Sequence, residues 1–356
     1  MQRGRWRFCS ALLAAIVRAR VAPLFATAFA LAFCLGASGQ PAPPASTVEW
    51  KLSTALGPAY PEGKAAEIWA GLIGERSGGR LRAKVFPGAA LAQRDPAREF
   101  VALRDGGIDL AVGSAAAWAM QVKELNLLAL PWLVPDADAL DALLASDVAS
   151  RLAAGVQGAG VVPVAWANAG FIELATKRAV HVPQDLRGLT LRVAGSPLML
   201  DTLLCLAARP AAMSTEAALA AQRNGTLDGE LSTVSAYRIS RAYAVGMPHL
   251  LLWGAHADAL LFAVNRAVWD GLSEADRELV AQAAREAAVQ AGALSRRQAD
   301  TQALAELARE GALVTRLTAP GKLPFREASQ PVYDRWTPLI GAGLVRAAEA
   351  ILAAPR

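Results

Sequence analysis

The sequence predicts an α/β protein with a parallel sheet, from the order of its elements and from its length. Apolar stretches of strand length alternate with stretches of helical periodicity from residue 48 onward. The first five are strand, helix, strand, helix and strand, at Val48–Ala55, Pro61–Arg76, Leu81–Phe86, Pro96–Arg104 and Ile108–Val112. This βαβαβ order is typical of a parallel sheet with helices on its faces. The roughly 317 residues after position 39 are enough for two domains.

Local patterns justify the first elements. Val48, Trp50 and Leu52 alternate with other residues, which is the period of a strand. The helix that follows carries apolar residues at helical spacing around Trp69 and ends at a Ser-Gly-Gly sequence. From strand or helix phase we predict that Trp50, Trp69 and Trp269 belong to the core.

The later elements follow the same reasoning. They are a helical stretch, a strand, a second α/β unit and another strand, at Asp136–Ala154, Val161–Trp166, Phe171–Leu252 and Ala259–Val264. From Ser273 to about Gly311 the pattern predicts one long helix, which at about 1.5 Å per residue would span roughly 58 Å. The alternatives are a helix broken near Gly292 and an oligomer-forming coiled coil, whose heptads would be unusually alanine-rich and irregular.

The first 39 residues have the organisation of a secretory signal peptide, followed by a disordered spacer at 40–47. Arginines precede an uncharged apolar run, Val21–Ala37, and small residues lead up to a cleavage site near Gly39. An uncleaved membrane anchor is the alternative, but the run contains Pro23 and falls short of the about 20 residues of a spanning helix. A lipoprotein signal at Cys34 would need a small residue where Phe33 stands.

Composition argues against several function classes. The formal net charge is +5, and the presequence holds five arginines and no acid, so the remaining chain is neutral (+5 − 5 = 0). We therefore expect no nucleic-acid partner. The three histidines, His181, His249 and His256, lack ligand spacing, so neither a metal nor another cofactor is expected. Cys205 lies in an apolar run and is predicted to be a buried structural thiol. Motifs of nucleophilic, phosphate-binding and zinc-dependent enzymes are absent from the sequence.

The segment from Leu189 to Pro197 indicates an anion site. Arg192 lies on the strand face opposite the apolar residues, and Ser196 and Pro197 suit the cap and first position of a helix. A guanidinium beside a helix N-terminus favours a carboxylate held by two hydrogen bonds. The alternative is an exposed strand arginine in a structural salt bridge.

The stretch from Leu186 to Gly229 resembles the solute-binding proteins of tripartite ATP-independent periplasmic (TRAP) transporters, the DctP-like family. The family pattern there is a DLxGLKIRV strand, a helix, a strand of small residues, a helix and a GxVDG turn. The similarity continues at residues 50–91, 103–114, 125–134 and 262–288. It therefore covers nearly all of the chain after residue 47.

The resemblance implies a two-lobed periplasmic-binding-protein-like fold (type II-like) with hinge strands and a long bracing helix. Lobe I would comprise residues 48–166 with a return segment at about 257–275, and lobe II residues 167–256. Residues 276–356 would pack across both lobes as the long helix and C-terminal helices. The hinge is expected near Ala165–Asn168 and His256–Leu260.

The function implied is non-catalytic capture of an organic acid in the periplasm by a monomer, for delivery to small and large TRAP membrane subunits. A ligand-sensing protein for a membrane receptor is one alternative. An enzyme on a similar two-lobed fold is the other, although no acid–base pair or nucleophile is placed by spacing.

Candidate ligand-binding residues lie where strands end, as expected of a cleft between lobes. They are Tyr60, Ser114, Trp118, Trp166 and Asn168 on the first lobe and its crossover, and Arg192, Glu230 and Ser232 on the second.

Two departures from the family pattern bear on the ligand. Many members carry a second arginine where this chain has Ile172, followed by Glu173, and an asparagine where it has Ser232. A monocarboxylate with an apolar or aromatic body is therefore favoured, with Trp118, Trp166 and Tyr60 as flat walls. Glu173 or Glu230 would contact a hydroxyl or amine of the ligand, or else lie in solvent. A small shift in alignment would instead bring Arg178 or Arg238 into the cleft.

Overall fold

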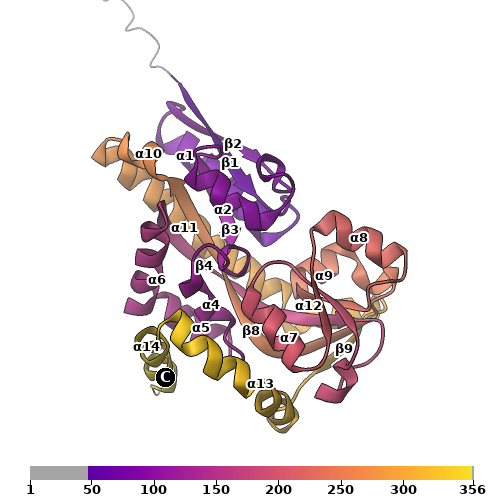
Figure 1. Cartoon of the computed structure of the whole chain (residues 1–356). Helices are drawn as coiled ribbons and strands as arrows, with labels where there is room; N and C mark the ends of the chain where they lie inside the picture. Colours follow the sequence, from indigo (N-terminus) through magenta and orange to yellow (C-terminus); the bar gives the residue numbers. More distant parts are fainter. Residues whose placement is uncertain (1–46, 355–356) are drawn as a thin grey trace, which may run out of the picture. The chain divides into compact units, whose positions relative to one another are not determined.

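The computed structural model describes residues 47–354 of the chain, except for the side chains of Thr215 and Glu216. All of these residues belong to one compact unit, Ser46–Arg356 (Figure 1). The predicted signal peptide, its cleavage near Gly39 and the lipoprotein alternative at Cys34 lie outside the described residues, as does nearly all of the predicted spacer.

Within the described residues, nine strands form one mixed sheet. They are β1 Val48–Thr54, β2 Leu81–Phe86, β3 Leu110–Ser114, β4 Val161–Thr176, β5 Thr190–Val193, β6 Arg209–Ala212, β7 Gly229–Thr233, β8 His249–Asn265 and β9 Leu313–Arg316. Their order is β2-β1-β3-β8-β4-β7-β5-β6, with β9 beside β8. The β1–β2, β1–β3, β5–β6 and β5–β7 pairs are parallel, as the sequence predicts, whereas β8 is antiparallel to both β3 and β4.

Strands β4 and β8 pass through both lobes. They pair antiparallel from Val161 opposite Asn265 to Thr176 opposite His249. We call the first lobe the part built around β1–β3, and the second lobe the part built around β5–β7. Figure 1 shows β8 and β4 running from the β1–β3 end toward α7, α8 and β9. Both strands are much longer than the sequence predicts, because their register shifts at bulges that interrupt the apolar pattern.

Helices cover the sheet on both lobes. They are α1 Pro61–Arg76, α2 Pro96–Arg104, α3 Ala115–Trp118, α4 Asn126–Ala129, α5 Ala137–Leu144, α6 Asp147–Gly158, α7 Pro197–Cys205, α8 Thr215–Arg223, α9 Val234–Ser240, α10 Arg266–Asp270, α11 Glu274–Gln298, α12 Thr301–Arg309, α13 Ala319–Ile340 and α14 Ala342–Ala353. Short 3₁₀ turns occur at Ala90–Ala92, Lys123–Leu125, Pro183–Leu186 and Ala242–Val245. The predicted bounds of α1, β2 and α2 are confirmed, since proline at the first turn marks each helix start.

The long C-terminal helix predicted from Ser273 to about Gly311 is wrong in its extent. It ends at Gln298, and Asp300 caps a new helix, α12, by accepting a hydrogen bond from Ala303 N. The break therefore lies beyond Gly292, which stays inside α11. The alanine-rich face of α11 is buried, and α11 contacts α1, β4 and α9.

The helical stretch predicted over 136–154 is also wrong in its extent. It is two helices, because Ser146 caps α6.

Two predictions about buried residues have mixed outcomes. Trp50 and Trp69 are buried, but Trp269 is only half-buried on α10. Cys205 is exposed rather than buried, because α7 turns Leu198 and Leu203 inward and leaves its last residues outside.

No described helix is by itself long and apolar enough to span a membrane; α13 and α14 pass that test only as a pair, bent by 116°.

A cavity between the two lobes

A cavity of about 230 Å³ lies between the lobes, at the ends of β1, β3, β5 and β7. Its polar lining comes from both lobes. The polar side chains are Tyr60, Glu62, Ser114 and Asp258 on the first lobe and Arg192, Gln222, Glu230, Ser232, Thr233 and Ser240 on the second. The rest of the lining is largely apolar, with Leu56, Ile172, Ala194, Leu219, Leu227 and Val245 among its members. This composition is typical of a pocket for a small organic ligand.

Arg192 lies inside this cavity and is paired. Residue 192 of β5 stands opposite residue 230 of the parallel strand β7, which brings the two side chains together. Arg192 Nη1 donates to Glu230 Oε2 at 3.1 Å, and Arg192 Nε donates to Met213 O at 3.2 Å. The two side chains are 12% and 15% exposed. The expected cleft arginine and the expected salt bridge are therefore both present, in one place.

Two carboxyl groups of the first lobe are buried at the opposite wall. Asp258 of β8 accepts from Ser114 Oγ at 2.6 Å and from Ala116 N at 3.0 Å. Glu62, in the first turn of α1, accepts from Thr54 Oγ1 at 2.7 Å. Burial raises the pKa of Glu62 to about 7 and that of Asp258 to about 6, although these hydrogen bonds act in the opposite direction.

Five of the eight residues that the sequence predicts for the site line the cavity: Tyr60, Ser114, Arg192, Glu230 and Ser232. Ile172, which stands where many family members carry a second arginine, lines it as well. Arg178 and Arg238 do not line it, because Arg178 donates to Asp185 O and Arg238 pairs with Glu306. The described lining therefore contains a single arginine.

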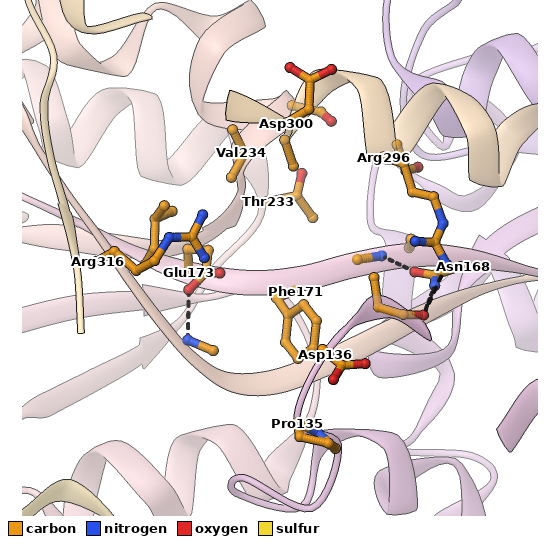
Figure 2. Close-up of a pocket in the computed structure, with 18 of the residues that line it drawn as sticks. Pro135, Asp136, Asn168, Phe171, Glu173, Thr233, Val234, Arg296, Asp300 and Arg316 are labelled. Atoms are coloured by element: carbon orange, nitrogen blue, oxygen red, sulfur yellow. Dashed lines mark hydrogen bonds between the residues drawn. The ribbon is translucent and has the colours of Figure 1, made fainter. Parts of the chain in front are cut away.

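A second cavity, of about 430 Å³, receives one of the remaining predicted residues (Figure 2). Asn168 lines it and donates to Ala137 O and to Asp141 Oδ1, so its amide joins the start of α5 instead of the first cavity. Phe171 and Glu173 also line the second cavity, whereas Ile172 between them lines the first. Strand β4 thus separates the two cavities.

Glu173 does not line the cavity between the lobes and is not exposed to solvent; of the two glutamates expected to contact the ligand, Glu230 lines that cavity. Glu173 is 7% exposed and accepts from Gly254 N at 3.0 Å, in the bulge where β8 leaves its register with β4. Burial raises its pKa to about 7, against backbone hydrogen bonds and the charges of Arg316 and Lys322. The carboxyl group of Glu173 thus accepts a hydrogen bond from the backbone of β8.

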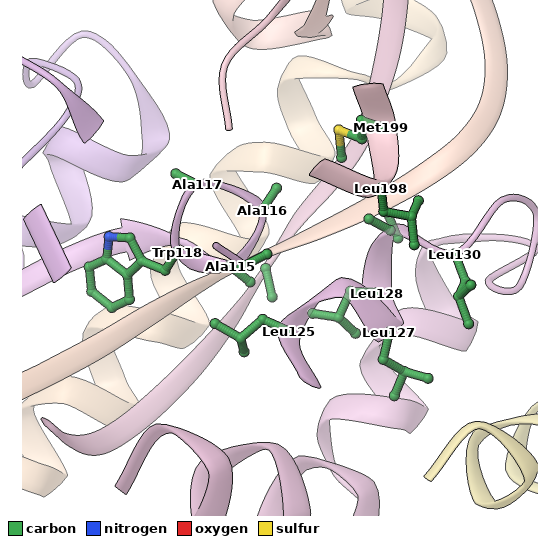
Figure 3. Packing of buried hydrophobic residues seen from close by; sticks show 14 of the residues in the cluster. Ala115, Ala116, Ala117, Trp118, Leu125, Leu127, Leu128, Leu130, Leu198 and Met199 are labelled. Carbon is green, nitrogen blue, oxygen red and sulfur yellow. The ribbon is translucent and has the colours of Figure 1, made fainter. Parts of the chain in front are cut away.

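The two tryptophans predicted as cavity walls lie elsewhere. Trp118 is fully buried and packs edge-on against Phe100, 5.6 Å between ring centroids. Figure 3 shows the Trp118 ring pointing away from the apolar side chains of α4 and α7, which lie on the other side of Ala115 and Ala116. Trp166 is half-buried and lines a separate surface pocket beside α5 and α11. Of the three aromatic walls that the sequence predicts, only Tyr60 reaches the cavity between the lobes.

The lobes meet directly at the start of α7, beside the cavity. Ser196 N donates to Ala116 O and Ser196 Oγ donates to Asn126 Oδ1, each at 3.0 Å. Gly195 has φ +120°, and a Cβ atom there would lie 2.8 Å from Ala117 Cα. Ser196 caps α7 as predicted. The helix N-terminus is packed against the first lobe, however, and Ser196 does not line the cavity.

Sequence reasoning missed Glu62 and Asp258. The available signals were weak: a glutamate directly after the proline that starts a helix, and one acid in an otherwise apolar strand. Both become recognisable only when burial and cavity lining are known. Within residues 47–354 no cluster of three potential metal-ligating side chains occurs.

Comparisons with known proteins agree on one family. The sequence model of bacterial extracellular solute-binding protein family 7 (DctP) matches residues 52–338. A TRAP periplasmic solute-binding protein from Ralstonia eutropha H16, with bound (S)-2-acetolactate, is 43% identical with a TM-score of 0.83, and the match covers 86% of this chain and 98% of that one. The C4-dicarboxylate-binding periplasmic protein DctP of Vibrio cholerae is 25% identical over 294 residues, 81% of this chain and 86% of its own. The two-lobed periplasmic-binding-protein-like fold is confirmed.

The buried carboxyl groups predict how stability depends on pH. Burial raises the pKa of Glu99 to about 8 and that of Glu62 to about 7, so the folded state holds protons that the unfolded state has lost. Acids with a raised pKa stabilise the fold at low pH, and this contribution is lost as the pH rises through those values. The melting temperature should therefore fall between pH 6 and pH 8. Below pH 6.5 the buried His256, whose pKa burial lowers to about 4, opposes the trend.

Thermal unfolding across pH 5.5–8.5 measures this dependence. Glu99→Gln should flatten the fall, because Glu99 is fully buried against Ser53 and loses its titration. Glu67→Gln removes a carboxyl group with 42% side-chain exposure from α1 and is the matched control. A wild-type melting temperature that rises from pH 6 to pH 8 would contradict the assignment.

Proposed function

The chain belongs to bacterial extracellular solute-binding protein family 7, and we propose that the organic acid it captures for a TRAP-type transporter is a small branched monocarboxylate. One observation carries this proposal. The described lining of the cavity between the lobes holds one arginine against three carboxyl groups, those of Glu62, Glu230 and Asp258. A ligand carboxylate has a cation to bind at Arg192, whereas a second carboxylate would meet acids.

The electrostatic argument is strongest at the Arg192–Glu230 pair. A monocarboxylate at Arg192 shares the guanidinium with Glu230, which already balances much of its charge. Like charges brought together in a desolvated site cost several kcal/mol. A C4-dicarboxylate, whose two charges both need partners, is therefore disfavoured relative to a ligand with a single charge.

Size and apolar lining support a compact, branched ligand. The cavity is about 230 Å³, and the aromatic walls that would favour a flat ligand are reduced to Tyr60. Ile172 and Leu227 offer aliphatic contacts instead. The relative from Ralstonia eutropha, 43% identical, was found with (S)-2-acetolactate, a branched monocarboxylate.

We further propose that the protein is exported to the periplasm and delivers its ligand to a small and a large TRAP membrane subunit. Relatives with periplasmic in their names support the location, and the predicted signal peptide agrees with it. Mass spectrometry of the exported protein should find a new N-terminus near residue 40. An intact Met1, or a lipid on Cys34, would contradict this location.

A thermal-shift screen tests the ligand class. A ligand at about 100 times its dissociation constant stabilises a protein by about 2.7 kcal/mol. We expect the largest shifts from branched monocarboxylates such as 2-acetolactate and 3-methylbutanoate derivatives. Shifts from succinate, malate or fumarate that exceed those of every monocarboxylate would refute the proposal.

Arg192→Ala should weaken binding of the monocarboxylate by roughly thirty-fold to several-thousand-fold, because it leaves a desolvated anion without its partner, at a cost of about 2–5 kcal/mol. Arg192→Lys should also bind poorly, since a point charge does not match the planar fork. Isothermal titration measures both.

Glu230→Gln separates ligand binding from a merely structural ion pair. It breaks the same pair but keeps the guanidinium, so affinity for the monocarboxylate should hold or increase. If Arg192→Ala and Glu230→Gln lowered the melting temperature alike and both left affinity unchanged, Arg192 would have only a structural role.

Closure of the lobes depends on Gly195. Gly195→Ala places a Cβ atom 2.8 Å from Ala117 Cα, which prevents Ser196 from reaching Ala116 and should weaken ligand binding at least tenfold. Gly188→Ala is the matched control, because Gly188 also has positive φ (+73°) but a Cβ there meets nothing within 4 Å. Equal losses of affinity in both variants would indicate backbone strain in place of a closing contact.

A further inference from the structure

Glu62 is the acid of the first-lobe wall whose hydrogen bonds leave one oxygen for a ligand. It is 6% exposed and lines the cavity between the lobes. Its three hydrogen bonds all go to Oε1, from Thr54 Oγ1 at 2.7 Å, Ala55 N at 2.8 Å and Leu56 N at 3.2 Å. Within residues 47–354, Oε2 accepts no hydrogen bond from the protein. We infer that Glu62 Oε2 recognises a hydroxyl group on the captured acid, an inference that rests on the proposed monocarboxylate function.

The neighbouring acid differs from Glu62 in this respect. Asp258 Oδ2 accepts from Ser114 Oγ at 2.6 Å, and its Oδ1 accepts from Ala116 N at 3.0 Å and Ala259 N at 2.9 Å. The Ser114 hydroxyl also accepts from Ala117 N. Asp258 and Ser114 are therefore occupied with holding the start of α3, and Glu62 is the acid on this wall with an oxygen to offer.

The backbone around Glu62 fixes where that oxygen lies. Three donors on the turn after β1 hold Oε1, and α1 begins one residue earlier, so the carboxyl group has little freedom to rotate. A buried acceptor left without a donor costs free energy, and closing the lobes removes the water that would otherwise supply one. A ligand that donates at this position therefore binds better than one that does not.

A hydroxyl group matches the site better than the other common donors. It supplies one hydrogen, which matches the one oxygen of Glu62 that accepts none from the protein. An ammonium group has three hydrogens to donate, and Asp258 and Ser114 beside Glu62 cannot accept the other two because they are already bonded to the protein. An oxo group has none. The predicted ligand is thus a branched hydroxy monocarboxylate, with its carboxylate on Arg192 in the second lobe and its hydroxyl on Glu62 in the first.

Four acids that share one carbon skeleton test the inference. They are 3-methylbutanoate and its 2-hydroxy, 2-oxo and 2-amino derivatives, titrated calorimetrically at pH 8, above the pKa of about 7 that burial gives Glu62. A hydrogen bond to a charged group corresponds to roughly 10- to 150-fold in affinity. The wild type should prefer the 2-hydroxy acid over the unsubstituted acid by a factor in that range, and over the 2-oxo and 2-amino acids as well.

Glu62→Gln should reverse this preference. The amide oxygen can keep the three donors of the turn, which leaves Nε2, a donor, facing the cavity. The 2-oxo acid, whose carbonyl only accepts, should then bind at least as well as the 2-hydroxy acid. Glu99→Gln is the matched control: it removes another buried carboxyl group of the first lobe that does not line the cavity, and the hydroxy-to-oxo ratio should stay as in the wild type.

The outcomes distinguish the inference from the proposed function. If the wild type binds the hydroxy and unsubstituted acids equally well, or binds the 2-amino acid (valine) most tightly, the role of Glu62 is overturned. The proposed capture of monocarboxylates then still stands. Binding of dicarboxylates but of none of the four acids overturns the proposed function itself. Because the wild-type ratio already decides the first point, the inference stays testable if Glu62→Gln does not fold.

Discussion

The antiparallel pairing of β4 with β8 is the interaction on which the rest of the structure depends. These two strands run through both lobes, so every other strand is attached to one end or the other of this pair. Because side chains alternate across a sheet, successive residues of β4 line cavities on opposite faces of the sheet. Ile172 lines the cavity between the lobes, and Phe171 and Glu173 line the one behind it. A shift of one residue in this register would exchange an aliphatic wall for a carboxyl group.

Carboxyl groups accept hydrogen bonds from the backbone at three places where this scaffold departs from regular structure. Glu173 accepts from the bulge of β8, Asp258 from the start of α3, and Glu62 from the turn after β1. An unpaired buried N–H costs about 1–3 kcal/mol, so these contacts stabilise conformations that strand or helix bonding cannot. The same placement fills the cavity wall with acids. The negative character on which the proposed choice of ligand rests is therefore also a consequence of how the fold is built.

The sequence predicts those features that have a local cause. Helices α1 and α2, which begin at proline, are placed to the residue, and strand-end residues such as Arg192 fall in the cavity. Features with a distant cause are missed. The bulge of β8 at Gly254 is hydrogen-bonded to Glu173, 81 positions away in the sequence. Trp118 returns to the core because Gly113 has no side chain, and a Cβ there would lie 2.2 Å from the indole ring.

The Arg192–Glu230 pair bears on how one arginine can serve both stability and binding. A guanidinium left unpaired in a cavity that water leaves on closure would be costly in the ligand-free protein, and Glu230 removes that cost. In the proposed complex, the ligand carboxylate gains less than it would at an unpaired arginine, because part of the charge is already balanced. The pair therefore lowers the maximum affinity for any anion, and lowers it most for ligands whose second charge would face Glu62 and Asp258. Selectivity between anions in such a site depends on where the protein already places negative charge. The acids of this cavity therefore help to determine the ligand as much as its arginine does.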